Sequence, residues 1–105
     1  MTDKQRTNLE EMLLRLNKRT KEDGQHLAAL DVEINQSVKF AHFFLNSAKG
    51  KGLNPDLRLA QRTAARHLEG NAAVAKKVKS RVQQQMQKRL DLCEQVAGIL
   101  AAMKT

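Results

Sequence analysis

Arginine residues that recur at helical spacing are the part of this sequence best suited to chemistry. Arg58, Arg62 and Arg66 follow one another at i, i+4 and i+8, so a helix would place all three on one face, opposite the apolar one. Guanidinium groups bind phosphate oxygens through forked hydrogen bonds, and arrays of them neutralise nucleic-acid backbones with release of counterions. Five lysines extend the cluster: Lys39, Lys49, Lys51, Lys76 and Lys77. We expect these eight residues to bind an anionic partner; the alternative is a solvated face that keeps the chain soluble.

The distribution of charge along the chain supports this expectation. Residues 34–90 contain twelve Lys and Arg but only two Asp and Glu, whereas residues 1–33 contain six and seven. The net charge of +8 therefore comes from the middle of the sequence. A segment of this kind favours an acidic protein or a nucleic acid as partner. A nucleic-acid-binding regulatory or architectural protein is our alternative hypothesis for the function.

Residue patterns typical of enzymes and metal sites are missing from the sequence. There is no Gly-rich phosphate loop ending in Lys-Ser/Thr, no pair of Cys and no His-Glu-x-x-His motif. His42 and His67 have no Cys or acid arranged with them to complete a zinc site, and we expect them to be solvated or packing residues. Cys93 lies near Leu90 and Val96, and we expect it to be a small core residue. We therefore expect a protein that is not an enzyme, with no catalytic residue, cofactor, metal or small-molecule substrate.

One strong break divides the chain near its middle. Gly50 and Gly52 can adopt positive φ. Asn54 and Pro55 are typical of the N-cap and the first residue of a helix. We therefore expect a turn here, with one helical segment on each side of it.

Apolar residues recur at spacings of three and four on both sides of this turn, which indicates one buried face per helix. The average spacing in the second segment is about 3.5 residues, as in coiled coils. The predicted buried face of the first segment, its seam, consists of Leu9, Leu13, Leu16, Thr20, Asp23, Leu27, Leu30, Ile34, Ser37, Ala41, Phe44 and Ala48. The predicted seam of the second segment consists of Leu57, Ala60, Ala64, Leu68, Asn71, Ala75, Val78, Val82, Met86, Arg89, Cys93, Val96, Leu100 and Met103.

These patterns predict an all-α fold, a long antiparallel helical hairpin with helices at about 3–49 and 55–103. We expect it to form a single helical domain over residues 1–105. Folding the two segments about Gly52 would set Leu30 opposite Val74 and its neighbour in sequence. Apolar residues would then meet apolar residues along both segments.

The alternative fold is a three-helix bundle in which the first segment is broken at Gly24. The seam turns polar over residues 18–23, and basic residues precede the Gly as they do at the C-terminus of a helix. We prefer the continuous helix because Gln25 and His26 are poor caps for a new helix. The seam also resumes in register after the polar stretch.

Residues 27–45 are apolar around much of the helix circumference. Val32 and Phe43 point away from the predicted seam, and Phe40 lies on the flank between them and the seam. In the second segment Leu59 also points away from it. Because a helix of this kind is normally buried on more than one side, we predict that these four residues contact a second copy or a different helical partner, completing a helical bundle. Alternatively, the two Phe rings stack on unpaired bases.

The expected location is the cytoplasm. No apolar stretch approaches the roughly 18 residues that span a bilayer, and the polar start does not look like a secretory signal. The single Cys forms no intramolecular disulfide and needs no oxidising compartment. Membrane binding is the least favoured hypothesis because helix pairing occupies the apolar face. Our leading hypothesis is an adaptor, chaperone or regulator that oligomerises and presents its basic residues to an acidic partner.

Overall fold

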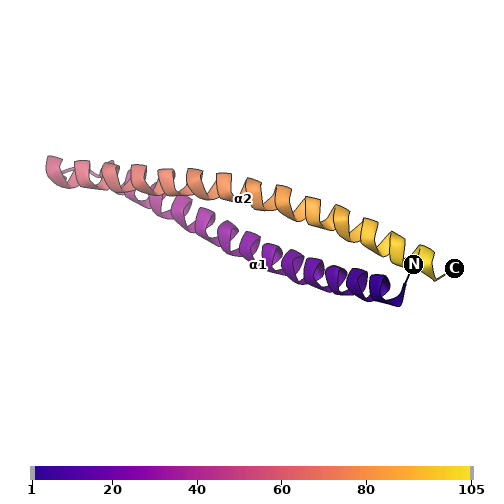
Figure 1. Ribbon diagram of the computed structural model, residues 1–105. Helices are drawn as coiled ribbons and strands as arrows, with labels where there is room; N and C mark the ends of the chain where they lie inside the picture. Colours follow the sequence, from indigo (N-terminus) through magenta and orange to yellow (C-terminus); the bar gives the residue numbers. More distant parts are fainter. Residues whose placement is uncertain (1, 105) are drawn as a thin grey trace. The chain divides into compact units, whose positions relative to one another are not determined.

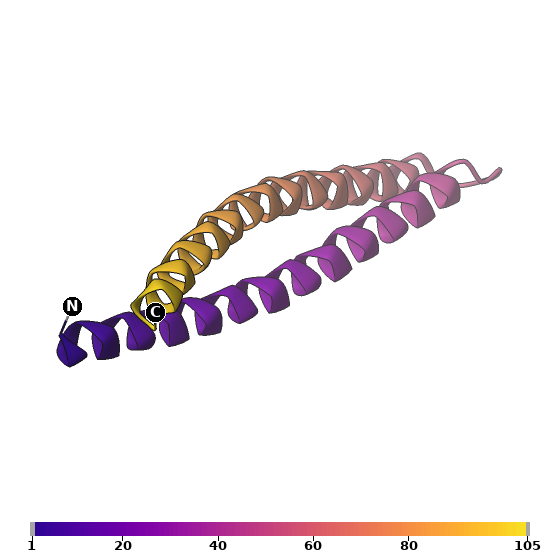
Figure 2. The same ribbon diagram turned by 90° about the vertical axis from the view of Figure 1, so that its right-hand side faces the viewer.

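The computed structural model describes residues 2–104, which form two helices, α1 (Asp3–Ala48) and α2 (Pro55–Met103), joined by a turn (Figures 1 and 2). The predicted all-α helical hairpin is thereby confirmed. The chain divides into two compact units, each containing a piece of both helices. The terminal unit joins the residues up to Leu27 with those from Arg81 onward, and the turn unit is Ala28–Ser80. The single domain that we expect over the whole chain stays a prediction.

Local hydrogen bonds account for where the helices begin. The backbone N–H of Gln5 donates to Thr2 Oγ1 (3.3 Å), and the N–H of Thr2 donates to Gln5 Oε1 (2.8 Å). This reciprocal pair is a capping box at the start of α1. At the start of α2, the N–H of Asp56 donates to Oδ1 of the N-cap Asn54 (2.8 Å). Between the helices Gly52 adopts a φ of 78°, a conformation that Gly reaches without strain.

Helix α1 continues without interruption through Gly24, so the three-helix alternative is wrong. The polar residues before this glycine are accommodated because they have partners. Thr20 Oγ1 donates to the carbonyl of Leu16 (2.8 Å), and Asp23 pairs with Arg89 of α2. A part-buried polar group destabilises a helix pair mainly when it lacks a partner, so the helix does not need to end here.

The buried face of α1 follows the predicted seam along the whole helix. All twelve predicted positions are buried or half-buried, and they alternate strictly at spacings of four and three. The most buried of them are 3 to 8% exposed: Leu30, Ile34, Ser37, Ala41 and Ala48. The hydrophobic pattern of α1 was therefore sufficient to predict its packing face.

The first half of α2 packs through a different face from the one predicted. Leu57 is 49% exposed, and Ala60 and Asn71 are also exposed, whereas Ala65 and Ala72 are 0 and 4% exposed. The buried and half-buried seam positions of α2 are Arg58, Gln61, Ala65, Leu68, Ala72, Ala75, Lys79, Val82, Met86, Arg89, Cys93, Val96, Leu100 and Met103. The difference arises because alanines allow close helix contact and because long polar side chains can line the interface with their aliphatic stems.

The register between the helices also differs from a hairpin folded about Gly52. That hairpin would place Ala73 opposite Asp31, but the contact is with Lys79, whose Nζ lies 2.6 Å from Asp31 Oδ1. In the terminal unit, Cys93 Sγ lies 3.6 Å from Asn17 Oδ1. Both contacts lie six residues further along α2 than the symmetric fold predicts.

Candidate partner-binding surfaces

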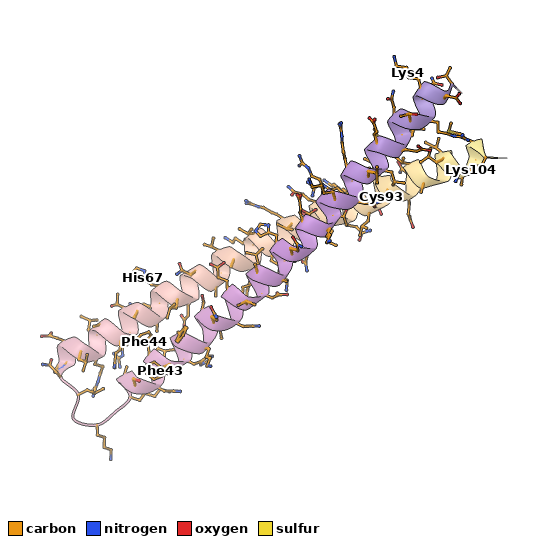
Figure 3. All side chains as sticks on the ribbon, turned by 90° about the horizontal axis from the view of Figure 1, so that it is seen from below. Lys4, Phe43, Phe44, His67, Cys93 and Lys104 are labelled. Carbon is orange, nitrogen blue, oxygen red and sulfur yellow. The ribbon has the colours of Figure 1, made fainter. Side chains whose placement is uncertain are left out.

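Two large aromatic side chains are exposed on α1 in the turn unit. Phe40 and Phe43, three residues apart on one side of the helix, are 51% and 61% exposed. The ring of Phe43 packs edge-on against Phe44, with ring centroids 5.5 Å apart and planes at 70° (Figure 3). Phe44 belongs to the seam and is half-buried. The ring contact therefore connects the exposed Phe43 to a half-buried residue of the seam.

The turn unit's part of α2 exposes a second apolar strip. Leu57, Ala60 and Val74 are exposed, and Ala64 and Val78 are half-buried. Leu57, Ala60 and Ala64 are three and four residues apart, and Val74 and Val78 lie fourteen residues, or two heptads, beyond Ala60 and Ala64, so all five share one side of the helix next to the seam. Most of them belong to the seam that the sequence predicted. Here α2 therefore has two adjacent apolar faces, one covered by α1 and one open.

A shallow groove shows that the two strips lie on the same side of the helix pair. It is lined by Leu30, Glu33, Asn71, Val74, Ala75 and Val78. On α1, Glu33 lies one heptad before Phe40 and therefore on the same side of the helix. On α2, Asn71 lies one heptad after Ala64, again on the same side. Both strips therefore continue from this groove. The resulting surface, which we call the apolar flank, consists of Phe40, Phe43, Leu57, Ala60, Ala64, Val74 and Val78. None of these residues is charged, although the turn unit contains nine Lys and Arg.

The other two predicted interface residues lie elsewhere in the turn unit. Leu59, 63% exposed, shares a side of α2 with Arg62 and Arg66. Val32, 55% exposed, faces away from the seam of α1. Of the predicted set, the two phenylalanines belong to the apolar flank, and Leu59 borders it, because Leu59 lines a shallow hollow together with Ala60 and Ala64.

The three predicted arginines do not share one exposed face. Arg62 and Arg66 are exposed, and Lys76 lies further along the same side of α2. Arg58 is half-buried at the seam, and its Nη2 donates to the carbonyl of Gly50 in the turn (3.3 Å). Its Nε is buried and has no hydrogen-bond partner among residues 2–104. The expected placement of Arg58 opposite the seam is wrong because the seam passes one residue later than predicted.

The remaining predicted lysines are exposed at separate places. Lys39 and Lys77 lie on the outer faces of α1 and α2, away from the seams. Lys49 and Lys51 lie in the turn. The predicted basic residues thus lie on several separate sides of the turn unit and do not converge on one pocket.

A pocket in the terminal unit brings three other arginines together, and the sequence patterns above do not predict it. It is lined by Asn8, Glu11, Met12, Arg15, Leu16, Arg19 and Arg89. Arg15 and Arg19 are one helical turn apart on α1, and Arg89 comes from α2. We call this the arginine pocket. Arg15 and Arg19 do not stand out in the net charge of residues 1–33 because acids in that segment cancel them, and Arg89 comes from a distant part of the sequence.

An apolar groove adjoins the arginine pocket. It is lined by Gln5, Asn8, Leu9, Met12 and Ile99. Met12 and Ile99 are 45% and 44% exposed, and Asn8 and Met12 line both hollows. The terminal unit therefore has a continuous surface that is apolar at one end and basic at the other.

Two of the three histidines, His42 and His67, lie on different helices, and the cysteine lies in the other unit. His42 is exposed on α1. His67 is exposed on α2, and Cys93 is half-buried on the seam of α2; both are labelled in Figure 3. In the part of the chain that the structure describes, no group of three or more His, Cys, Asp and Glu could hold a metal ion.

The chain matches no protein-family model, no curated protein and no solved structure. Between residues 2 and 104, neither helix contains a stretch long and apolar enough to cross a membrane. The case for a function therefore depends on the surfaces of the two units.

Proposed function

We propose that this protein is a non-enzymatic helical assembly protein, an adaptor, chaperone or regulator, that self-associates through the apolar flank. The observation that carries this proposal is the exposure of Phe40 and Phe43 beside an open apolar strip of α2. In this assembly the basic residues outside the contact would be available to an acidic partner. A cytoplasmic location fits the single Cys.

The composition of the turn unit's core supports burial of the flank. Its buried residues are Leu30, Ile34, Ser37, Ala41, Ala48, Ala65, Ala72 and Ala75. Alanine removes little apolar surface from water, whereas full burial of a Val, Leu or Phe side chain contributes roughly 1.5–3 kcal/mol. Covering Phe40, Phe43, Leu57 and Val74 would thus add several kcal/mol, a large share of the roughly 5–15 kcal/mol typical of a folded domain.

A second copy of the chain suits this surface because none of the seven flank residues is charged, and Glu33 is the one charged residue that lines the groove between the two strips. In a twofold dimer each copy contributes the same patch, so a charged patch would meet a like charge. The flank has no Lys or Arg, and Arg62, Arg66 and Lys76 lie on another side of α2. Four helices would then pack together, the arrangement that completes a helical bundle.

Light scattering coupled to size-exclusion chromatography tests the proposal. We expect a dimer or larger assembly at tens of micromolar, and a monomer for the double variant Phe40→Glu/Phe43→Glu. Gln83→Glu/Gln84→Glu adds the same two charges at exposed positions of the terminal unit and should leave the mass unchanged. Circular dichroism checks that both variants remain helical. A monomeric wild-type protein would rule out self-association and leave a different helical partner for the flank.

Nucleic-acid binding is the second candidate function, and the exposure of Arg62, Arg66 and Lys76 on one side of α2 favours it. Several phosphates neutralised together would give an affinity that falls steeply with salt, by roughly one unit of logarithmic slope per phosphate. Fluorescence anisotropy with random duplex DNA and single-stranded RNA measures this slope. If Arg62→Glu/Arg66→Glu leaves both affinities unchanged, these arginines do not contact phosphates.

A further inference from the structure

We propose that the terminal unit docks an acidic amphipathic helix of another protein, with apolar side chains in the groove at Met12 and Ile99 and a carboxylate in the arginine pocket. This inference goes beyond the proposed function because the surface belongs to the other unit of the chain and requires no self-association.

The guanidinium groups of the pocket are positioned to bind a carboxylate by donating hydrogen bonds to it. Within residues 2–104, neither Arg15 nor Arg19 forms an ion pair or a side-chain hydrogen bond. Arg89 is oriented by its ion pair with Asp23, and its side chain is 25% exposed. Only one acid, Glu11, lines the pocket, so the lining is net positive. An Arg fork matches the two oxygens of a carboxylate, which gives such a contact direction as well as attraction.

The adjoining groove supplies the apolar half of the site. Met12 and Ile99 are close to half exposed and come from different helices, so a side chain seated between them would contact both. A flexible Met adapts to varied apolar partners. From Gln5 to Arg19, the combined surface spans fifteen residues of α1, a rise of about 21 Å along the helix. That length suits a partner helix of about four turns, the mode in which an amphipathic helix lies in a groove.

Charge identifies the occupant as an acidic segment from another protein. The terminal unit contains ten Lys and Arg against seven Asp and Glu, and the turn unit nine against four. In a twofold contact, a second copy would bring its own net-positive arginine pocket against this one, whereas the apolar flank of the turn unit meets no such repulsion. A nucleic acid satisfies the arginines but has no aliphatic side chains for the groove. A helix with apolar residues on one stripe and an acid one or two turns further along satisfies both ends.

A designed peptide probes this site on the full-length protein. The probe is a fluorescent helical peptide of about 16 residues with Leu on one stripe and two Glu beyond it; a second peptide has Lys in place of Glu. Anisotropy should show micromolar binding of the Glu peptide and binding of the Lys peptide at least roughly tenfold weaker, a difference of about 1.4 kcal/mol. Equal binding of both peptides, or no binding of the Glu peptide, would overturn the proposal.

Matched variants locate the contact. Arg15→Gln/Arg19→Gln should weaken binding of the Glu peptide by roughly tenfold, the equivalent of losing one charged contact of about 1.4 kcal/mol. Arg62→Gln/Arg66→Gln removes the same charge at the same spacing in the turn unit and should leave binding unchanged. If the two double variants weaken it equally, the peptide recognises net charge only and the assigned site is wrong. The Phe40→Glu/Phe43→Glu variant should still bind, which separates this inference from self-association.

Discussion

Lys79 of α2 contacts Asp31 of α1 through an ion pair of 2.6 Å, although Lys79 occupies a seam position of the turn unit. Their side chains are 32% and 51% exposed, so the pair itself contributes about 0–1 kcal/mol. A polar residue at a seam position has a second effect, because only registers that provide it with a partner are favourable. In this pair we see one reason why α2 packs further along α1 than a symmetric turn predicts.

A more buried ion pair in the terminal unit gives a prediction for stability. The side chains of Asp23 and Arg89 are 15% and 25% exposed. Asp23→Leu leaves the charge of Arg89 without its partner, and we expect it to lower the free energy of unfolding by roughly 1–3 kcal/mol. Asp23→Leu/Arg89→Leu should recover most of this loss, because two apolar residues pack at the seam. Urea unfolding measures both values; a double variant less stable than the single one would contradict the prediction.

Two glycines should respond in opposite ways to replacement by alanine. Gly24 lies inside α1, and a Cβ there would meet no described atom within 4 Å beyond the helix itself. Gly24→Ala should therefore raise the free energy of unfolding by about 0.5–1 kcal/mol. Gly52 has a φ of 78°, so Gly52→Ala should lower it by about 1 kcal/mol. Thermal unfolding followed by circular dichroism tests both, and destabilisation by Gly24→Ala would indicate a break in α1.

The hydrophobic pattern was enough to predict α1 but not α2, and the reason lies in two adjacent residues. Asn71 belongs to the predicted seam, which begins at the large side chain of Leu57. Ala72 belongs to the observed seam, which α1 covers. Both patterns have a spacing of three and four, so periodicity cannot choose between them. The choice depends on which face of α2 allows α1 to approach closely. Alanines favour one face through this close contact, which exists only once the helices have paired. The arginine pocket was missed for a related reason, since Arg89 joins Arg15 and Arg19 only through the observed register.

Substitutions at these two positions of α2 distinguish the observed seam from the predicted one. Ala72 is 4% exposed, so Ala72→Leu overfills the contact with α1 and should lower the free energy of unfolding by about 1–3 kcal/mol. Asn71 is exposed at the neighbouring position, and Asn71→Leu should change stability by less than about 0.5 kcal/mol. Chemical unfolding of each variant at low protein concentration provides the comparison. The opposite order of effects would support the predicted seam.

A cysteine crosslink tests the register in the terminal unit. Asn17 Oδ1 lies 3.6 Å from Sγ of Cys93, so Asn17→Cys would introduce a second thiol near the natural one. Mild oxidation should join the two within one chain, which a faster-migrating band on a non-reducing gel reveals. Lys18→Cys places the new thiol on the outer side of α1 and serves as the matched control, for which we expect little intramolecular product.

The same experiment separates a hairpin from an exchange of helices between copies. In a hairpin the crosslink of the Asn17→Cys variant closes a loop within one chain, and its yield is independent of protein concentration. If α1 of one copy paired instead with α2 of another, oxidation would yield covalent dimers. Because the Phe40→Glu/Phe43→Glu variant is expected to be monomeric, the crosslink should form within one chain in that background too. Covalent dimers as the main product there would contradict the hairpin itself.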